Sequence, residues 1–103
     1  MKPVEITEKT FEEFVSSNDT VVMDLWAPWC GPCKMLSPVL DELGEEHEEI
    51  VIGKVNVDDN MEIARKYSVN VIPALLLFKN GQLKDKSVGY LEKNEILDFI
   101  NKN

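Results

Sequence analysis

The chain has 103 residues, of which 44% are hydrophobic, and it carries 19 acidic against 11 basic side chains, for a net charge of −8. This length accommodates one hydrophobic core, so we expect residues 1–103 to form a single domain. The acidic charge argues against binding to nucleic acid, whose affinity depends on cationic contacts with phosphates.

The N-terminal residues 1–5 lack the apolar stretch of a secretory signal peptide. The longest apolar run, residues 71–78, is far shorter than the roughly 20 residues that a helix needs to span a bilayer. Together these features predict a cytoplasmic protein that is not inserted in a membrane.

The first elements are recognisable by their periodicity. Residues 4–6 alternate in polarity and predict a short strand, and residues 11–15 place apolar side chains on one helical face. Residues 20–26 are apolar at nearly every position, which is typical of a strand buried on both faces of a parallel sheet. Asp24 is the exception, and an isolated charge of this kind ordinarily reaches solvent or satisfies a local donor.

Both cysteines, Cys30 and Cys33, follow this strand where the pattern becomes helical. The first turn of a helix brings positions i and i+3 together, so the pair can close a small disulfide ring. At the helix N-terminus, free N–H groups and the macrodipole favour the thiolate of Cys30. We therefore predict that Cys30 is the nucleophile and that Cys33, with less access to solvent, resolves a mixed disulfide. Pro32 suits the first helical turn, where its missing N–H costs little.

Two other uses of the cysteine pair compete with redox chemistry. A zinc site requires about four ligands, and His47 is the one histidine available beside the two cysteines. A purely structural disulfide is disfavoured because so small a ring constrains little unfolded-chain entropy. In a reducing compartment the pair is also better explained as catalytic than as a permanent crosslink. The residues favour a redox pair that needs no metal or other cofactor.

The remaining elements in chain order are a helix over residues 33–47, a strand over 50–57, a helix between the turn at 58–60 and residues 68–70, a strand over 74–78, a strand over 83–88 and a helix over 92–101. Two strands separated by a helix imply parallel pairing. Asn80-Gly81 is a two-residue hairpin signal that predicts antiparallel pairing of the two strands beside it.

Two helix starts carry a capping-box pattern, in which a short polar side chain and a glutamate three residues later satisfy free backbone N–H groups. The pairs are Thr10 with Glu13 and Asp59 with Glu62, although Thr7 suits the first cap equally well. We expect side-chain caps at both helix N-termini.

The segment Trp26-Ala27-Pro28-Trp29-Cys30-Gly31-Pro32-Cys33-Lys34 resembles the active-site segment of thioredoxins. Other residues match the family as well, namely the strand aspartate Asp24, the helix proline Pro38, Lys54, the segment Ile72-Pro73-Ala74-Leu75, and the glycines Gly81 and Gly89. The resemblance covers about residues 4–100. This sequence departs from the family pattern at Leu25, where many members have phenylalanine, and at Ala74, where threonine is usual. It implies an α/β thioredoxin fold with a central mixed sheet of four or five strands and helices on both faces.

The resemblance also implies roles for individual residues. Desolvation beneath the cysteines would raise the pKa of Asp24, so that it exchanges a proton with Cys33, and Lys54 would moderate that rise. A cis bond between Ile72 and Pro73, rather than an ordinary turn, would leave the backbone of Ile72 free to pair with an extended substrate segment. The implied substrate-binding residues are Trp29, Gly31, Pro32, Ile72, Pro73 and Gly89.

The expected function is therefore reduction of protein disulfides, with Cys30–Cys33 as the redox-active disulfide. The resemblance implies disulfide-containing substrate proteins and a flavin-containing thioredoxin reductase as electron donor, and we expect a monomer. An oxidase or isomerase is disfavoured because Gly31-Pro32 contains no histidine and the chain no secretory signal. The alternative from a different functional class is a binding module that holds a partner protein on the same substrate-binding residues and carries out no redox chemistry.

Overall fold

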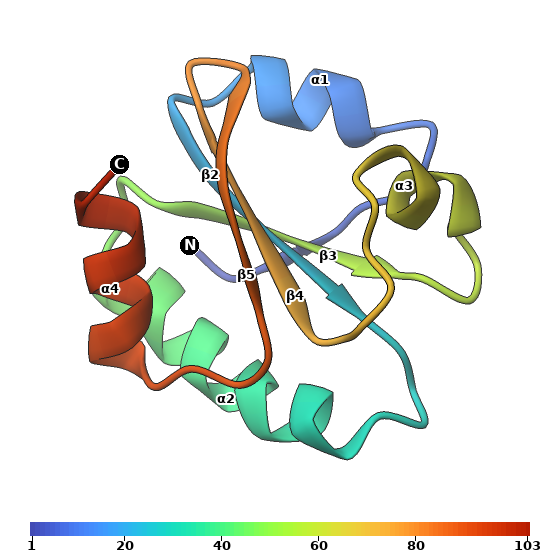
Figure 1. Ribbon diagram of the computed structural model, residues 1–103. Helices are drawn as coiled ribbons and strands as arrows, with labels where there is room; N and C mark the ends of the chain where they lie inside the picture. The colour runs from blue at the N-terminus through green and yellow to red at the C-terminus, as the bar shows by residue number, and fades with distance from the viewer.

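The computed structural model describes residues 1–103. A five-stranded sheet in the order β1-β3-β2-β4-β5 forms the centre of the molecule (Figure 1). The elements in chain order are β1 (Val4–Glu5), α1 (Phe11–Ser16), β2 (Thr20–Trp26), α2 (Gly31–Glu46), β3 (Val51–Asn56), α3 (Met61–Lys66), β4 (Ala74–Lys79), β5 (Gln82–Val88) and α4 (Lys93–Asn101).

The sheet is mixed, as the sequence predicts. β2 lies at its centre, parallel to β3 and antiparallel to β4, and β4 pairs in antiparallel fashion with β5. Asn80 and Gly81 turn the chain between β4 and β5 with φ values of 53° and 81°. Positive φ at both central residues is what a type I′ hairpin turn requires, so the hairpin prediction is confirmed.

The core has two layers because side chains along a strand point alternately to opposite faces of the sheet. On one face of β2, Met23 and Leu25 pack with residues of α1 and α3. On the other face, Val22 and its neighbours Leu75 and Leu77 on β4 pack with α2 and α4. Figure 1 shows α1 and α3 to the upper right of the sheet and α2 and α4 to its lower left. The expected helices on both faces are confirmed.

The capping boxes expected for the first and third helices do not form. Thr10 precedes α1 but makes no side-chain cap, because its hydroxyl bonds back to the preceding loop. α3 begins after Asn60 rather than Asp59, and neither side chain caps it. Its N-terminus is satisfied instead by Glu8, whose carboxylate accepts a hydrogen bond from the Glu62 N–H at 3.0 Å. A contact between distant segments thus replaces the local pattern.

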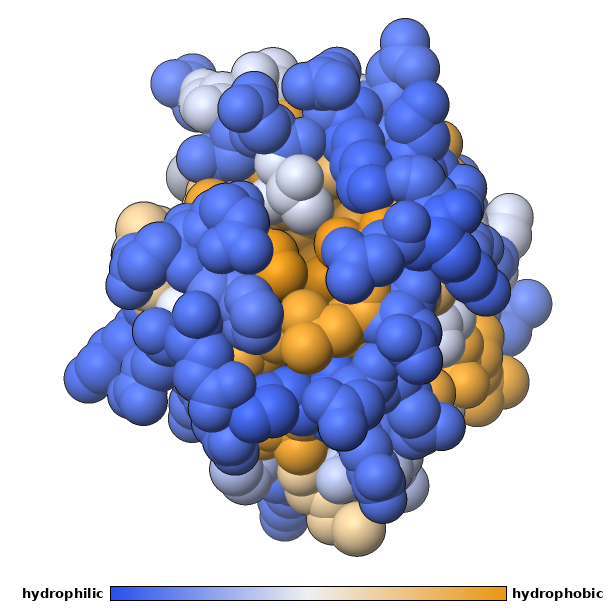
Figure 2. Space-filling model, turned by 90° about the vertical axis from the view of Figure 1, so that its left-hand side faces the viewer, coloured by the Kyte–Doolittle hydropathy of each residue, from blue (hydrophilic) through white to orange (hydrophobic).

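The molecular surface around α4 is mostly hydrophilic. Figure 2 shows the side of the molecule on which α4 lies, where hydrophilic side chains surround a small central area of apolar ones. The longest helix, α2, has 16 residues. None of the helices combines the length and the hydrophobicity needed to cross a membrane.

Replacing Leu77 by alanine should lower the free energy of unfolding by about 2–5 kcal/mol, because Leu77 is fully buried between the sheet and the helices α2 and α4. Leu83, which is 45% exposed on β5, provides the matched control. Its alanine variant should change stability by less than about 1 kcal/mol. Urea unfolding of both variants checks this, and equal losses would contradict the two-layer core.

Candidate functional site

Four chain segments meet at one edge of the sheet as a consequence of strand direction. β2 and β3 are parallel and end side by side, with Trp26 paired to Asn56. β4 is antiparallel to β2, so it begins at the same edge, where Ala74 pairs with Leu25. Val88, at the end of β5, is in turn the partner of Ala74. The segments that follow β2, β3 and β5 and the one that precedes β4 therefore converge.

The segment after β2 carries the two cysteines, which form a disulfide with their Cα atoms 5.3 Å apart. Cys30 is the N-cap of α2, and its sulfur accepts a hydrogen bond from the Cys33 N–H at 3.2 Å. Gly31 and Pro32 are the first two helical residues, and both are exposed. The helix begins between the cysteines, so its free N–H groups and positive end are directed at the Cys30 sulfur, which favours a thiolate there.

The expected difference in solvent access between the cysteines is small in this disulfide form. Cys30 is 5% exposed and Cys33 is 4% exposed. Burial thus contributes little to the asymmetry of the pair. The difference that we predict in their chemistry therefore depends on position, because one sulfur lies at the helix N-terminus and the other belongs to the first turn.

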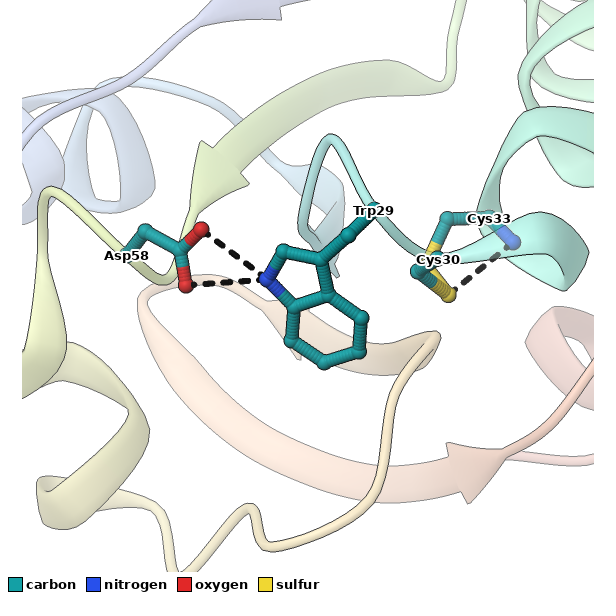
Figure 3. Close-up of a disulfide and its surroundings, with 4 residues drawn as sticks. All are labelled: Trp29, Cys30, Cys33 and Asp58. Atoms are coloured by element: carbon teal, nitrogen blue, oxygen red, sulfur yellow. Dashed lines mark hydrogen bonds between the residues drawn. A yellow bond between two sulfur atoms is a disulfide. The ribbon is translucent and has the colours of Figure 1, made fainter.

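Trp29 lies beside the disulfide and is fixed by the segment that follows β3. Its indole Nε1 donates a hydrogen bond to the carboxylate of Asp58, with the nearer oxygen at 3.0 Å. Figure 3 shows the ring between Asp58 and the two cysteines. The side chain is nevertheless 69% exposed. A large aromatic surface held in place by one hydrogen bond is well suited to contact a partner protein.

The segment before β4 approaches the cysteines from the other side. The Ile72-Pro73 peptide bond is cis, which confirms the prediction. The Pro73 carbonyl accepts a hydrogen bond from the Gly89 N–H at 2.8 Å, whereas the N–H and C=O of Ile72 have no partner within the chain. The Ile72 side chain packs against the buried cluster of Ala27, Cys30 and Cys33, and Val71 beside it is 60% exposed. An extended chain can add to such a free backbone edge.

Asp24 is fully buried, and both oxygens of its carboxyl lack a hydrogen-bond partner. It lies two residues after Val22 on β2 and so on the face that α2 covers. Desolvation raises its pKa from 3.8 to about 7, while the charge of Lys54 lowers that pKa and the charge of Glu5 raises it. The carboxyl can therefore gain and lose a proton near neutral pH.

Lys54 is the register partner of Asp24 on the neighbouring strand. Its ammonium donates a hydrogen bond to the Ser37 hydroxyl of α2 at 2.8 Å and lies 5.5 Å from the centre of the Trp26 ring. Lys54, Ser37 and Cys33 line a cavity of about 120 Å³ at this edge.

No cluster of three or more histidine, cysteine, aspartate or glutamate side chains is placed to hold a metal ion.

Comparison with known proteins agrees with this arrangement. Residues 2–102 match the family model described as Thioredoxin. The chain belongs to the thioredoxin family. Like other members, it is a protein-disulfide reductase with a redox-active Cys-x-x-Cys disulfide, here Cys30–Cys33.

Individual thioredoxins are similar over nearly the whole chain. A thioredoxin of Rickettsia bellii (strain RML369-C) is 44% identical over 100 residues, which cover 95% of each chain. One from Pyropia yezoensis is 42% identical over 104 residues, covering 99% of this chain and 97% of the relative. The solved structure of a mutant thioredoxin from Halobacterium salinarum NRC-1 superposes with a TM-score of 0.92 at 33% identity, covering 98% of this chain and 89% of that one. The thioredoxin fold is confirmed.

The thioredoxin site brings together the residues singled out in the sequence, and it adds three that were missed: Asp58, Ser37 and Glu5. Asp58 follows β3 as Trp29 follows β2, and the ends of parallel strands meet, so this juxtaposition was open to prediction. Ser37 and Glu5 have no comparable signal. Each is an ordinary polar residue whose role depends on which neighbour it faces.

Replacing Asp24 by asparagine should raise the free energy of unfolding of the disulfide form by about 4 kcal/mol at pH 8. The pKa of Asp24 is about 3.8 in the unfolded chain and about 7 in the folded one, so keeping the ionised carboxylate buried at pH 8 destabilises the fold. Below pH 3.8 both states hold the proton, so there the carboxyl costs nothing. The penalty grows as pH rises to 7 and is constant above it.

Urea unfolding of the oxidised wild type and of Asp24→Asn at pH 4 and pH 8 measures this difference. The variant should gain much more stability at pH 8 than at pH 4. The same difference at both pH values would contradict a raised pKa for Asp24.

Proposed function

We propose that this chain reduces disulfides of other proteins by dithiol-disulfide exchange through its Cys-Gly-Pro-Cys pair, with Cys30 as nucleophile. The observation that carries the proposal is the start of α2 at Gly31, which directs backbone N–H groups at the Cys30 sulfur. The Cys30 thiolate attacks a substrate disulfide. A mixed disulfide with Cys30 forms, and one substrate thiolate leaves and takes up a proton.

In the second half of the reaction Cys33 acts as the resolving thiol. It gives its proton to the Asp24 carboxylate beneath α2, and the resulting thiolate attacks the Cys30 sulfur. The Cys30–Cys33 disulfide forms, the mixed disulfide breaks, and the second substrate thiolate leaves. Two electrons have passed from the pair to the substrate, and Asp24 returns its proton to the departing thiolate or to solvent. Lys54 moderates the pKa of Asp24 through its charge.

The substrate docks on the surface around the disulfide. The partner-free backbone of Ile72 pairs with an extended substrate segment, and Trp29 supplies an exposed aromatic contact. Gly89 and Pro73, joined by their backbone hydrogen bond, form another part of this docking surface. Gly31 and Pro32 are exposed and lack bulky polar side chains, so a substrate chain can approach the sulfurs closely.

The chain works as a reductant in the cytoplasm, as a single-domain monomer over residues 1–103. No histidine between the cysteines stabilises the dithiol form, and a less stabilised reduced form is a better electron donor. Its partners are disulfide-containing proteins, and a flavin-containing thioredoxin reductase returns it to the dithiol state.

A Cys33→Ser variant should perform the first step and stop, because the resolving thiol is missing. Incubated with an excess of a disulfide-containing protein, it should accumulate a mixed disulfide through Cys30, which non-reducing electrophoresis and mass spectrometry detect. The matched control is Cys30→Ser, which should trap at least ten times less. Equal trapping by the two variants would overturn the assignment of the nucleophile.

A further inference from the structure

Lys54 lies between two carboxyl-bearing residues but forms an ion pair with neither. In the sheet, Glu5 of β1 and Asp24 of β2 are its register partners on the two sides. The ammonium instead donates a hydrogen bond to Ser37 of α2 at 2.8 Å, and the oxygens of Asp24 remain without any partner.

This arrangement runs against the usual preference of buried charges. A hydrogen bond between an ammonium and a carboxylate is roughly twice as strong as one between neutral groups, and a buried carboxylate without a partner is costly. Lys54 and Asp24 are register partners across the parallel β2–β3 pair, so their side chains leave the same face of the sheet, and the flexible lysine side chain can turn toward Asp24. The anchor that the structure provides against that rotation is the half-buried hydroxyl of Ser37.

We propose that Ser37 is a positioning residue, whose hydroxyl holds the Lys54 ammonium against α2 and keeps it from pairing with Asp24. The inference rests on the proposed proton transfer between Asp24 and Cys33. An ion pair with Lys54 would stabilise the Asp24 carboxylate, and so weak a base would accept the Cys33 proton poorly near neutral pH.

The other groups on this face do not replace Ser37. Glu5 lies on β1, beyond Lys54, and β4 contributes Leu75, which carries no charge, opposite Asp24. On α2, Lys34 and Cys33 line the same cavity as Lys54. Lys34 is a further cation, and it offers no oxygen that could accept a hydrogen bond from the Lys54 ammonium.

The test is the ionisation of Asp24 in the full-length disulfide form, followed by the ¹³C chemical shift of its carboxyl carbon from pH 4 to pH 10. Neither cysteine titrates in this form. In Ser37→Ala the released ammonium should reach Asp24, and the midpoint should fall by about one pH unit or more. Ser37→Thr keeps a hydroxyl and should leave the midpoint near that of the wild type. Alanine favours helices, so the first variant should fold.

A double-mutant cycle with Lys54→Met separates positioning from a general effect on the cavity. In the Lys54→Met background, Ser37→Ala should leave the Asp24 midpoint unchanged. An unchanged or higher midpoint in the Ser37→Ala single variant would overturn the proposal, as would an equal fall without Lys54. The titration involves no turnover, so it tests the positioning role of Ser37 separately from the reaction. If the midpoint falls in Ser37→Ala while the mixed disulfide is resolved at an unchanged rate, Ser37 positions Lys54 but Asp24 does not transfer the proton of Cys33.

Discussion

The hydrogen bond from the Cys33 N–H to the Cys30 sulfur exists because α2 begins at Gly31, between the two cysteines. A helix that started one turn earlier would bury both sulfurs within it, and one that started later would leave both in a loop. Only the observed start gives one sulfur the free N–H groups of the helix N-terminus and places the other inside the first turn. The two cysteines are almost equally buried, so we expect this start to be the main source of any difference in their reactivity.

The sheet supplies the other parts of the site through strand direction alone. Parallel β2 and β3 bring Trp29 to Asp58, and antiparallel β4 brings the cis Ile72-Pro73 bond to the same edge. The buried Asp24 beneath α2 lowers stability at neutral pH, since its carboxyl has no hydrogen-bond partner. A stability cost at a functional site is expected where the chemistry requires a proton acceptor with a raised pKa. In our proposal Ser37 preserves the raised pKa of Asp24, because its hydroxyl binds the Lys54 ammonium, which would otherwise pair with the Asp24 carboxylate.

The periodicity of the sequence predicted the strands, the hairpin at Asn80-Gly81 and the helices, because each depends on local spacing and on burial. The resemblance to thioredoxins added what no local pattern contains, above all the cis bond before Pro73. Neither expected capping box forms, because other segments compete for the groups involved. The Thr10 hydroxyl bonds to the loop before α1, and Glu8, far from α3 in the sequence, accepts the hydrogen bond at the N-terminus of α3. The contact between Lys54 and Ser37 was equally hidden, since no local pattern in the sequence says which residue of α2 a lysine on β3 faces.

Unequal acidity of the two cysteines is the claim on which the reaction depends. It is tested most directly by alkylating the reduced protein across a pH series and following each cysteine separately by mass spectrometry. We predict that Cys30 reacts at a distinctly lower pH than Cys33 and below the range of an ordinary thiol, whose midpoint is about 8.5. Identical pH profiles for both cysteines, centred on that ordinary value, would contradict it.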